Sequence, residues 1–377
     1  MEKNKLRNLI EEHNSDIDIS ISSDNKTYED RLVLNNPHLN ISQIPQSYRR
    51  YGYGLLSYCV KKFVFKWFED YEQNHLFEKV QAKFTNSGMA AIDLALNVIA
   101  DGGTKRIIAP KNLYFATDEL IDSYKNTLFY NISRFNTRRD LEKLLDNVRG
   151  NEILYLETCA NSPDMTLWEG NSIKELSREF EYVIVDGTLI GACKINPELF
   201  ENDNVVYVES LSKNYHSETS SKITSGIIVY PSRLEELFQK RFYCSGVYLQ
   251  LNDLMEIPIE IYDVGKERIM KISKNVQEFY KNAKKICQTG SIKVSELSDN
   301  ILNTPLVVFL DFQNKSRLKT FMEKSQLRQR GSFGHNETYI LPIGLMWDTA
   351  PPGLARIAFG KNSDNSKLYG ALREVNN

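Results

Sequence analysis

Long apolar runs are absent from this chain. None approaches the roughly 20 residues that span a bilayer, and the polar start, Met1 to Lys5, is not followed by an apolar segment of the signal-peptide type. We therefore expect a soluble protein of the cytoplasm with no membrane partner.

Cysteine and histidine are also scarce, with five of each in 377 residues. The cysteines form no C-x-x-C pair, and their odd number and scatter argue against both a disulfide framework and a zinc site. We expect most of them to be buried as small hydrophobic side chains. The histidines lack the spacing of metal ligands, so no metal site is predicted. Only His216, three residues after Lys213, is placed to reach a candidate pocket, and its role stays open.

The chain also lacks an excess of positive or negative charge. The 47 Lys and Arg residues nearly balance the 49 Asp and Glu residues, which gives a formal net charge of −2. Binding to a phosphate backbone requires a concentrated basic surface, so nucleic acid is not an expected partner. A content of 41% hydrophobic and 25% charged residues suits a soluble globular chain of about two domains.

Strand-like and helix-like patterns alternate through the middle of the chain. The expected strands are short β-branched or aromatic runs at 106–109, 127–130, 153–156, 182–185, 205–208 and 226–229. The expected helices between them are 118–124, 138–148 and 172–180. This alternation is typical of an α/β fold with a mostly parallel sheet and helices on both of its faces.

A second block follows this sheet. A long helical pattern at 264–283 leads to expected strands at 305–310 and 354–358 and expected helices at 316–325 and 367–375. That mixture is α+β in character. The sequence therefore predicts an N-terminal arm (1–45), a large α/β domain (46–257) and a smaller C-terminal α+β domain (258–377).

Two successive strands of the predicted sheet end in chemically active groups. One runs into Asp186, and the next runs into Glu209 and the motif Ser210-Leu211-Ser212-Lys213. Ligands of open α/β sheets bind outside the carboxyl ends of the strands, so Asp186 and Lys213 should face one pocket. A surface lysine in a loop is the alternative, because a motif as short as Ser-x-Ser-Lys also arises by chance.

Two other segments are suited to an anion. Ser87-Gly88-Met89 runs directly into a helix-forming stretch, and a helix start offers free backbone N–H groups to a phosphate. An ordinary serine N-cap is the alternative. The loop from Tyr48 to Gly54 holds Arg49 and Arg50 among three tyrosines and can present bidentate donors to an anion. An exposed turn with stacked Arg and Tyr side chains is the alternative there.

Seven short motifs occur in an order that suggests a family. They are Tyr48-Arg49-Arg50-Tyr51-Gly52, Ser87-Gly88-Met89-Ala90-Ala91, Leu113-Tyr114, Glu157-Thr158-Cys159-Ala160-Asn161, Val185-Asp186-Gly187-Thr188, Ser210-Leu211-Ser212-Lys213 and Gly353-Leu354-Ala355-Arg356. Together they resemble the Cys/Met-metabolism group of pyridoxal-phosphate (PLP) enzymes of fold type I, which includes cystathionine γ-synthase, cystathionine lyases and methionine γ-lyase. The likeness extends from about Tyr48 to Gly360, and the shared order argues against coincidence.

The resemblance implies a PLP site and a role for each matching residue. Lys213 would hold the cofactor aldehyde as a Schiff base and shuttle the Cα proton, and Asp186 would keep the pyridine nitrogen protonated. Tyr114 would stack on the ring, and Lys213, Tyr114 and Tyr48 form the implied catalytic set. The other implied cofactor-binding residues are Ser87, Gly88, Met89, Arg50, Asn161, Thr188, Ser210 and Ser212.

The resemblance also implies a substrate site and an assembly. Arg356 would clamp the α-carboxylate of an L-amino acid as a bidentate fork, and Ser332 is implied as a second substrate contact. Tyr48 and Arg50 would reach into the pocket of a partner subunit across a two-fold axis. A homodimer, or a tetramer built from it, is therefore the expected assembly.

Departures from the family pattern surround the expected pocket mouth. Tyr53-Gly54-Leu55 stands where the family has Asn-Pro-Thr, Phe115-Ala116-Thr117 stands in place of Gly-Gly-Thr, and Ser162-Pro163 follows Asn161. The segment after Lys213 differs as well. Cofactor binding is therefore better supported by the resemblance than the identity of the substrate is.

Three functions remain open from the sequence. The first is a lyase or transferase acting at Cβ or Cγ of a sulfur-containing or O-activated amino acid, which Tyr48-x-Arg50 and Ser87-Gly88-Met89 favour. The second is an aminotransferase, because Ser210 to Lys213 and Arg356 to Gly360 also resemble aminotransferase motifs. The third is a non-catalytic paralogue, against which the retained lysine, aspartate and arginine argue. The amino acid, the leaving group and the choice between elimination and replacement are not fixed by the sequence.

Overall fold

The computed structural model of the protein describes residues 59–100, 106–127, 131–146, 148, 150–215, 224–249, 260–288 and 290–376. The predicted N-terminal arm, the Tyr48–Arg50 loop, His216 and the predicted domain boundary near residue 258 all lie outside these residues. Within the described ranges, four of the five cysteines are buried and Cys244 is exposed.

The larger sheet has seven strands in the spatial order β1-β7-β6-β5-β4-β2-β3. Their bounds are β1 Val80–Thr85, β2 Arg106–Pro110, β3 Asn131–Phe135, β4 Glu152–Glu157, β5 Tyr182–Asp186, β6 Val205–Glu209 and β7 Gly226–Pro231. The five strands β3, β2, β4, β5 and β6 run parallel, whereas β7 and β1 are antiparallel to their neighbours. The predicted α/β fold with a mostly parallel sheet is confirmed.

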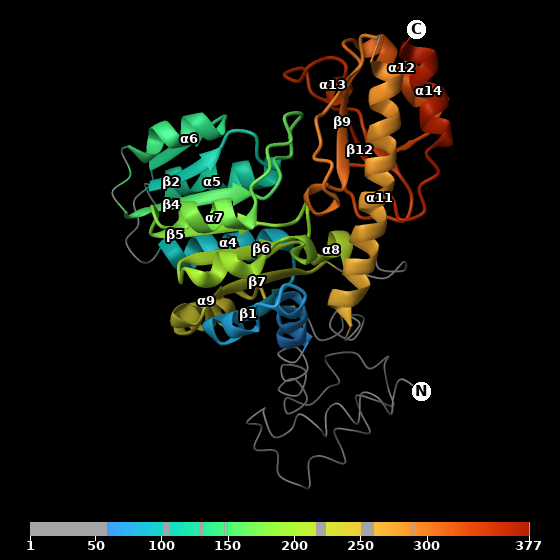
Figure 1. The fold of residues 1–377 in the computed structure, drawn as a ribbon. Helices are drawn as coiled ribbons and strands as arrows, with labels where there is room; N and C mark the ends of the chain where they lie inside the picture. Colours follow the sequence, from blue (N-terminus) through green and yellow to red (C-terminus); the bar gives the residue numbers. More distant parts are fainter. Residues whose placement is uncertain are drawn as a thin grey trace, which may run out of the picture.

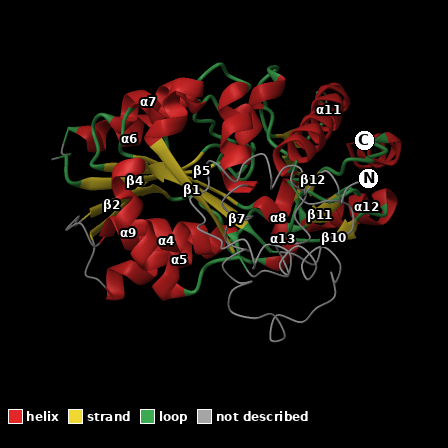
Figure 2. Ribbon diagram, turned by 90° about the horizontal axis from the view of Figure 1, so that it is seen from below, coloured by secondary structure: helices red, strands yellow, loops and turns green. Residues whose placement is uncertain are grey.

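Helices cover both faces of this sheet because its central strands are buried on both sides. Residues that alternate along a strand enter different cores: Val183 and Val205 pack with Ile173 of α7, whereas the neighbouring Ile184 and Val206 pack with residues of α4, α5 and α9. Figure 2 shows the two helical layers with the strands between them. The helices of this part are α4 Gly88–Ala100, α5 Phe115–Thr127, α6 Arg138–Leu145, α7 Gly170–Ser177, α8 Leu211–Asn214 and α9 Glu235–Ser245, preceded by a helix at 59–69.

The differences from the predicted strands lie at the two edges of the sheet. β1 was not predicted, and β3 begins at Asn131 where a strand was expected at 127–130. Of that expected strand only Thr127 is described, and it ends α5. An edge strand needs fewer apolar residues than a central one, so its sequence signal is weaker.

The smaller, C-terminal sheet has five strands of mixed direction in the order β10-β11-β12-β9-β8. Their bounds are β8 Lys293–Val294, β9 Val307–Asp311, β10 Arg328–Gln329, β11 Tyr339–Leu341 and β12 Leu354–Ala358. The helices beside this sheet are α11 Ile261–Cys287, α12 Lys315–Ser325, α13 Ile343–Met346 and α14 Ser366–Asn376. Figure 1 shows α11 running from the level of α8 in the larger part to the far end of the smaller part.

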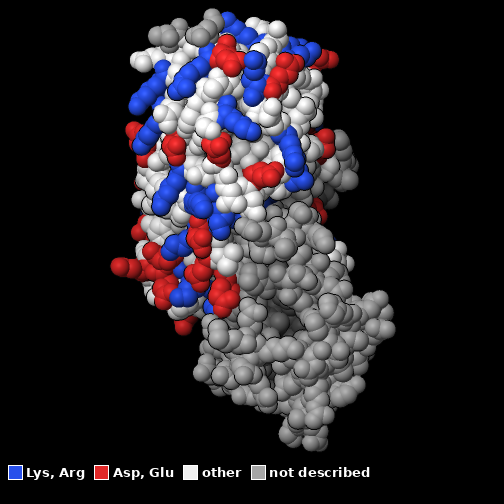
Figure 3. Space-filling model, turned by 90° about the vertical axis from the view of Figure 1, so that its right-hand side faces the viewer, with Lys and Arg blue, Asp and Glu red and all other residues white. Residues whose placement is uncertain are grey.

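The side of the molecule on which the C-terminal part lies has no concentration of one charge over its described residues. Figure 3 shows Lys and Arg side chains intermixed with Asp and Glu side chains over the described part of that face. Among the described helices, none is long and apolar enough to pass through a membrane.

Candidate functional site

A cavity of about 210 Å³ lies at the carboxyl ends of β4, β5 and β6. These strands end at Glu157, Asp186 and Glu209, and the first two of these residues face the cavity. The position is the one at which open α/β sheets bind their ligands. The lining residues are Ser87, Gly88, Met89, Ile92, Tyr114, Glu157, Cys159, Asn161, Asp186, Thr188, Leu189, Ser210, Ser212, Lys213, Thr224 and Phe333.

Asp186 is a buried carboxylate held in a fixed orientation. Its Oδ1 accepts hydrogen bonds from the backbone N of Thr188 at 2.9 Å and from the Thr188 hydroxyl at 2.5 Å, and its Oδ2 accepts from the Tyr155 hydroxyl at 3.3 Å. Burial raises its pKa, and the hydrogen bonds oppose that rise. A buried carboxylate of this kind is stabilised by a cationic ligand group, such as a protonated ring nitrogen.

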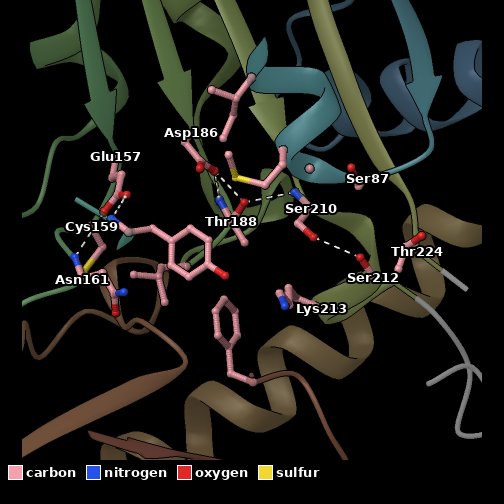
Figure 4. A pocket seen from close by; sticks show the side chains of 16 residues that line it. Ser87, Glu157, Cys159, Asn161, Asp186, Thr188, Ser210, Ser212, Lys213 and Thr224 are labelled. Carbon is pink, nitrogen blue, oxygen red and sulfur yellow. Dashed lines mark hydrogen bonds between the residues drawn. The ribbon is translucent and has the colours of Figure 1, made fainter. Parts of the chain in front are cut away.

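Lys213 extends into the same cavity from α8. Its Nζ donates a hydrogen bond of 2.9 Å to Oγ of Ser332 and lies 5.7 Å from the centre of the Phe333 ring. Burial, and then the positive charge of Arg356, lower the pKa of this amine. A lowered pKa increases the fraction of neutral, nucleophilic amine. Figure 4 shows Lys213, Asp186 and Ser210 around one space.

The start of α4 forms a cradle for an anion. No described residue accepts a hydrogen bond from the backbone N–H of Gly88 or Met89, and both line the cavity. The Ser210 and Ser212 hydroxyls face this helix start and lie 3.1 Å apart. A Cβ atom on Gly88 would lie 2.6 Å from Cβ of Ser210, so only glycine leaves this space open. Free N–H groups, hydroxyls and a helix N-terminus together suit a phosphate.

Glu157 is a second buried carboxyl group in the cavity. Its Oε1 accepts from the backbone N of Tyr114 at 2.7 Å, and its Oε2 accepts from the backbone N of Asn161 at 3.3 Å. Burial, with the nearby charge of Asp186, raises its pKa to about 8. One carboxyl group therefore positions both the loop that carries Tyr114 and the loop that carries Asn161.

Arg356 lies behind Asn161 and does not line the cavity. Its Nη1 donates to Oδ1 of Asn161 at 2.9 Å, its Nη2 donates to the carbonyl of Gly331, and its Nε is buried without a partner among the described residues. Burial lowers its pKa to about 10, and Tyr114 opposes this shift. The guanidinium is thus one side chain away from the cavity.

The loop from Gly331 to His335 brings the C-terminal part onto Lys213. Gly334 has φ +79°, and a Cβ there would overlap the carbonyl oxygen of Lys213. Arg268 of α11 fixes the loop, since its Nε and Nη2 donate to the Gly334 carbonyl at 3.1 and 2.7 Å. The loop also supplies Ser332 and Phe333 to the surroundings of the amine.

Most of the residues predicted for the site come together in this cavity. Those that line it are Lys213, Tyr114, Ser87, Gly88, Met89, Asn161, Asp186, Thr188, Ser210 and Ser212. Ser332 and Arg356 stand just outside, and each is one hydrogen bond from a lining residue. Tyr48 and Arg50 lie outside the described residues. The described part of the chain holds no group of three His, Cys, Asp or Glu side chains that could bind a metal ion.

Sequence reasoning assigned no role to several lining residues. Glu157 ends a strand in the same way as Asp186, so the signal that identified Asp186 was also present for Glu157. Thr224 and Phe333 had no such signal, because Thr224 precedes a strand, β7, and Phe333 reaches the cavity from the C-terminal part of the chain. The remaining unassigned residues are Ile92, Cys159 and Leu189.

Comparison with known families gives a match. The sequence profile of the Cys/Met metabolism PLP-dependent enzyme family matches residues 71–253, which hold Asp186, Lys213 and the start of α4. No curated protein sequence matches the chain significantly.

Solved structures with the same fold cover most of the chain. A cystathionine γ-synthase of Xanthomonas oryzae pv. oryzae, in complex with aminoacrylate and cysteine, is 16% identical, with a TM-score of 0.63 over 78% of this chain and 80% of that one. The O-acetylhomoserine sulfhydrylase of Wolinella succinogenes is also 16% identical, with a TM-score of 0.63 over 82% and 96%.

A third similar structure carries a modified lysine. It is a Campylobacter jejuni protein described as an O-acetylhomoserine (thiol)-lyase and containing N'-pyridoxyl-lysine-5'-monophosphate. It is 17% identical, with a TM-score of 0.62 over 78% of this chain and 81% of that one. At these identities the three structures share the fold with this chain, a seven-stranded α/β sheet followed by a smaller mixed sheet.

Proposed function

We propose that the protein, whose residues 71–253 match the Cys/Met metabolism PLP-dependent enzyme family, holds PLP on Lys213 and catalyses elimination or replacement at Cβ or Cγ of an L-amino acid. The observation that carries this proposal is the convergence of three groups on one cavity: the buried carboxylate of Asp186, the amine of Lys213 and the open start of α4. The pyridoxyl-lysine of the Campylobacter jejuni structure supports the choice of cofactor.

The lining residues fit each part of the cofactor. Ser210, Ser212 and the N–H groups of Gly88 and Met89 would hold the phosphate, and Asp186 would pair with the ring nitrogen and keep it protonated. The bound cofactor supplies an electron sink for negative charge that develops at Cα of the substrate. Burial keeps Asp186 away from water, which strengthens its interaction with a cationic ring.

Lys213 has two tasks in this proposal. Its amine would bond covalently to the cofactor aldehyde at rest, and after exchange for the substrate amine it would accept the proton from Cα. Its lowered pKa favours both, because each requires the neutral amine. Ser332 holds Nζ at 2.9 Å and so orients the base.

Tyr114 and Tyr48 are the reason for proposing side-chain chemistry. Elimination or replacement needs an acid or base that moves protons near the leaving group on Cβ or Cγ. Tyr114 lines the cavity beside Arg356, whose charge opposes the rise in the phenol pKa that burial causes. Tyr48, with Arg50, would supply the second phenol from a partner subunit, so the proposed active unit is a symmetric homodimer. Arg356 and Asn161 would receive the substrate carboxylate.

Borohydride reduction followed by peptide mapping tests the cofactor proposal. We expect one pyridoxyl adduct, on Lys213, which the Lys213→Ala variant lacks and the Lys222→Ala control retains. An adduct on Lys222 or Lys194, or no adduct on folded protein supplied with PLP, would contradict the assignment.

A substrate screen tests the reaction. O-acylated homoserines, cystathionine, cysteine and methionine are incubated with the holoenzyme, and both the side-chain group and the amino group are followed. We expect release or exchange of the side-chain group. Transfer of the amino group to an added keto acid, with the side chain intact, would show that the protein is an aminotransferase.

A further inference from the structure

A second cavity, of about 190 Å³, lies next to the cofactor cavity and is not used by the proposed reaction. Residues of the larger part, including Thr158, Glu169 and Lys194, form one side of it, and Asn300 and Asn303 of the C-terminal part form the other. The volume is below the range of roughly 300–1,000 Å³ that is usual for drug-sized ligands, so the occupant would be a small metabolite.

Lys194 is the unusual residue of this second cavity. It ends η3 (Ala192–Lys194), is only 6% exposed, and its Nζ donates to Oγ of Ser273 and, at 2.6 Å, to the carbonyl of Thr304. Both acceptors are neutral, since the Ser273 hydroxyl itself donates to the carbonyl of Ile269. Over the described ranges, no carboxylate lies within ion-pair distance of this amine.

A buried ammonium group without a counter-ion is costly, and burial accordingly lowers the pKa of Lys194 to about 8. Three N–H donors are present on the charged form, and the two hydrogen bonds use only two of them. Lys194 itself lines the second cavity, and Thr304, whose carbonyl accepts from its Nζ, directly follows the lining residue Asn303. An anionic group that entered there would supply the missing counter-charge.

A carboxylate of the protein stands at the rim of the same cavity. Glu169 is exposed, and its Oε1 accepts a hydrogen bond of 2.7 Å from the Asn303 amide across the cavity wall. Among the described residues that line the cavity, Lys194 and Glu169 alone are charged, and their charges are opposite. The arrangement suits a small molecule with a negative group at one end and a positive group at the other.

We propose that the second cavity binds a small L-α-amino acid, with its carboxylate on Lys194 and its ammonium group toward Glu169. Neither residue lines the cofactor cavity, so this binding is separate from binding of the substrate. Trp168 also lines the second cavity and provides a fluorescent reporter within it.

The second cavity is connected to the first through Thr158. The backbone N and the hydroxyl of Thr158 donate to the carbonyl of Asp186 at 2.8 and 3.2 Å, while its neighbours Glu157 and Cys159 line the cofactor cavity. Occupancy of the second cavity would therefore act on the position of Asp186. This regulatory consequence rests on the proposed function, whereas the binding itself does not.

Titration calorimetry of the full-length protein with L-alanine tests the binding. We expect Lys194→Met to weaken it at least about tenfold, because it removes one member of a buried charge pair, and the exposed Glu169→Gln to weaken it to a smaller extent. Arg356→Lys should leave it unchanged. Near pH 8, binding should take up protons, since a carboxylate favours the charged form of Lys194.

Two other probes separate the two ends of the ligand. Acetate, which lacks the ammonium group, should bind more weakly than L-alanine, and L-alaninamide, which lacks the carboxylate, should not bind. Absence of saturable binding of L-alanine, or binding that neither Lys194→Met nor Glu169→Gln weakens, overturns the proposal. If Lys194→Met fails to fold, Glu169→Gln and the two probes still decide between binding and no binding in the second cavity. If Arg356→Lys is the one variant that abolishes binding of L-alanine, the binding belongs to the cofactor cavity and the proposal is wrong.

Discussion

Nζ of Lys213 donates a hydrogen bond to Oγ of Ser332 across 119 positions of sequence, so the C-terminal part of the chain holds the amine at the end of the larger sheet. The hydroxyl is the acceptor, and it therefore orients the amine and favours its charged form. The contact makes Ser332 a positioning residue for the reaction that we propose.

Replacing Ser332 with alanine should lower kcat/KM about tenfold, the equivalent of about 1.4 kcal/mol for a lost hydrogen bond to an amine. The pKa of Lys213 should fall further, so the limb of the pH–rate profile that this amine governs should move to lower pH. Ser332→Thr keeps a hydroxyl and serves as the control. An unchanged pH profile in Ser332→Ala would show that the contact does not position the base.

Removing the hydroxyl of Tyr114 should separate ring stacking from proton transfer. Tyr114→Phe keeps the aromatic ring, so the affinity for PLP should stay within about twofold, whereas loss of a positioned acid or base should lower kcat by about 10²–10⁴. Cofactor titration and steady-state kinetics measure the two effects. Wild-type turnover in Tyr114→Phe would exclude this phenol as the proton relay.

Buried carboxyl groups should make stability depend on pH. Burial raises the pKa of Glu209 from 4.5 to about 8, and its Oε2 accepts from the Tyr207 hydroxyl at 2.6 Å. Between these two pKa values the folded chain binds more protons than the unfolded chain. The contribution of Glu209 to the free energy of unfolding is therefore fully present below about pH 4.5 and is lost as the pH rises toward 8. Glu157, with its pKa also raised to about 8, adds to the same loss.

Glu209→Gln should therefore reduce the difference between the free energies of unfolding at about pH 5 and about pH 7.5 by roughly 1–3 kcal/mol. Urea unfolding midpoints at the two pH values measure the change. The control is Glu296→Gln, because Glu296 is exposed and has a lowered pKa beside Lys284, so it should not flatten the slope. Equal slopes in wild type and Glu209→Gln would mean that Glu209 is ionised in the folded protein.

Subunit mixing tests the proposed dimer. If Arg50 acts in the partner's pocket, then mixing inactive Arg50→Ala and Lys213→Ala proteins should restore up to about one quarter of wild-type activity, because half of the dimers are mixed and each mixed dimer has one complete site. Activity is measured after subunit exchange is verified by native mass spectrometry. A mixture that exchanges subunits and stays inactive would place Arg50 in its own subunit's site or outside the site.

The sequence predicted the central sheet because its strands are buried on both faces and read as continuous apolar runs. The edge strands β1 and β3 were missed for the opposite reason. They carry polar residues, the half-buried Gln81 and Lys83 and the exposed Asn131, and these residues hide the strand pattern.

The same contrast holds at the site. Asp186 and Lys213 were identified because the chain places them directly after strands, and a strand end is a local feature of the sequence. Phe333 and Arg268 act through contacts with residues that are far from them in sequence, which no local pattern encodes. The buried state of Glu157 and its two N–H partners likewise depend on how β4 meets the loop after β2.

Gly334 lies against the carbonyl of Lys213 and is held by Arg268, while Lys194 holds the carbonyl of Thr304. The contact of Gly334 with Lys213 and that of Lys194 with Thr304 join the larger part of the chain to the C-terminal part. A chimaera that takes residues 59–249 from one homologue and residues 260–376 from another would therefore pair Lys213 with a foreign loop and Lys194 with a foreign carbonyl. These two halves must be inherited and engineered together, because the side-chain Nζ of each lysine finds its hydrogen-bond acceptors only in the other half among the described residues.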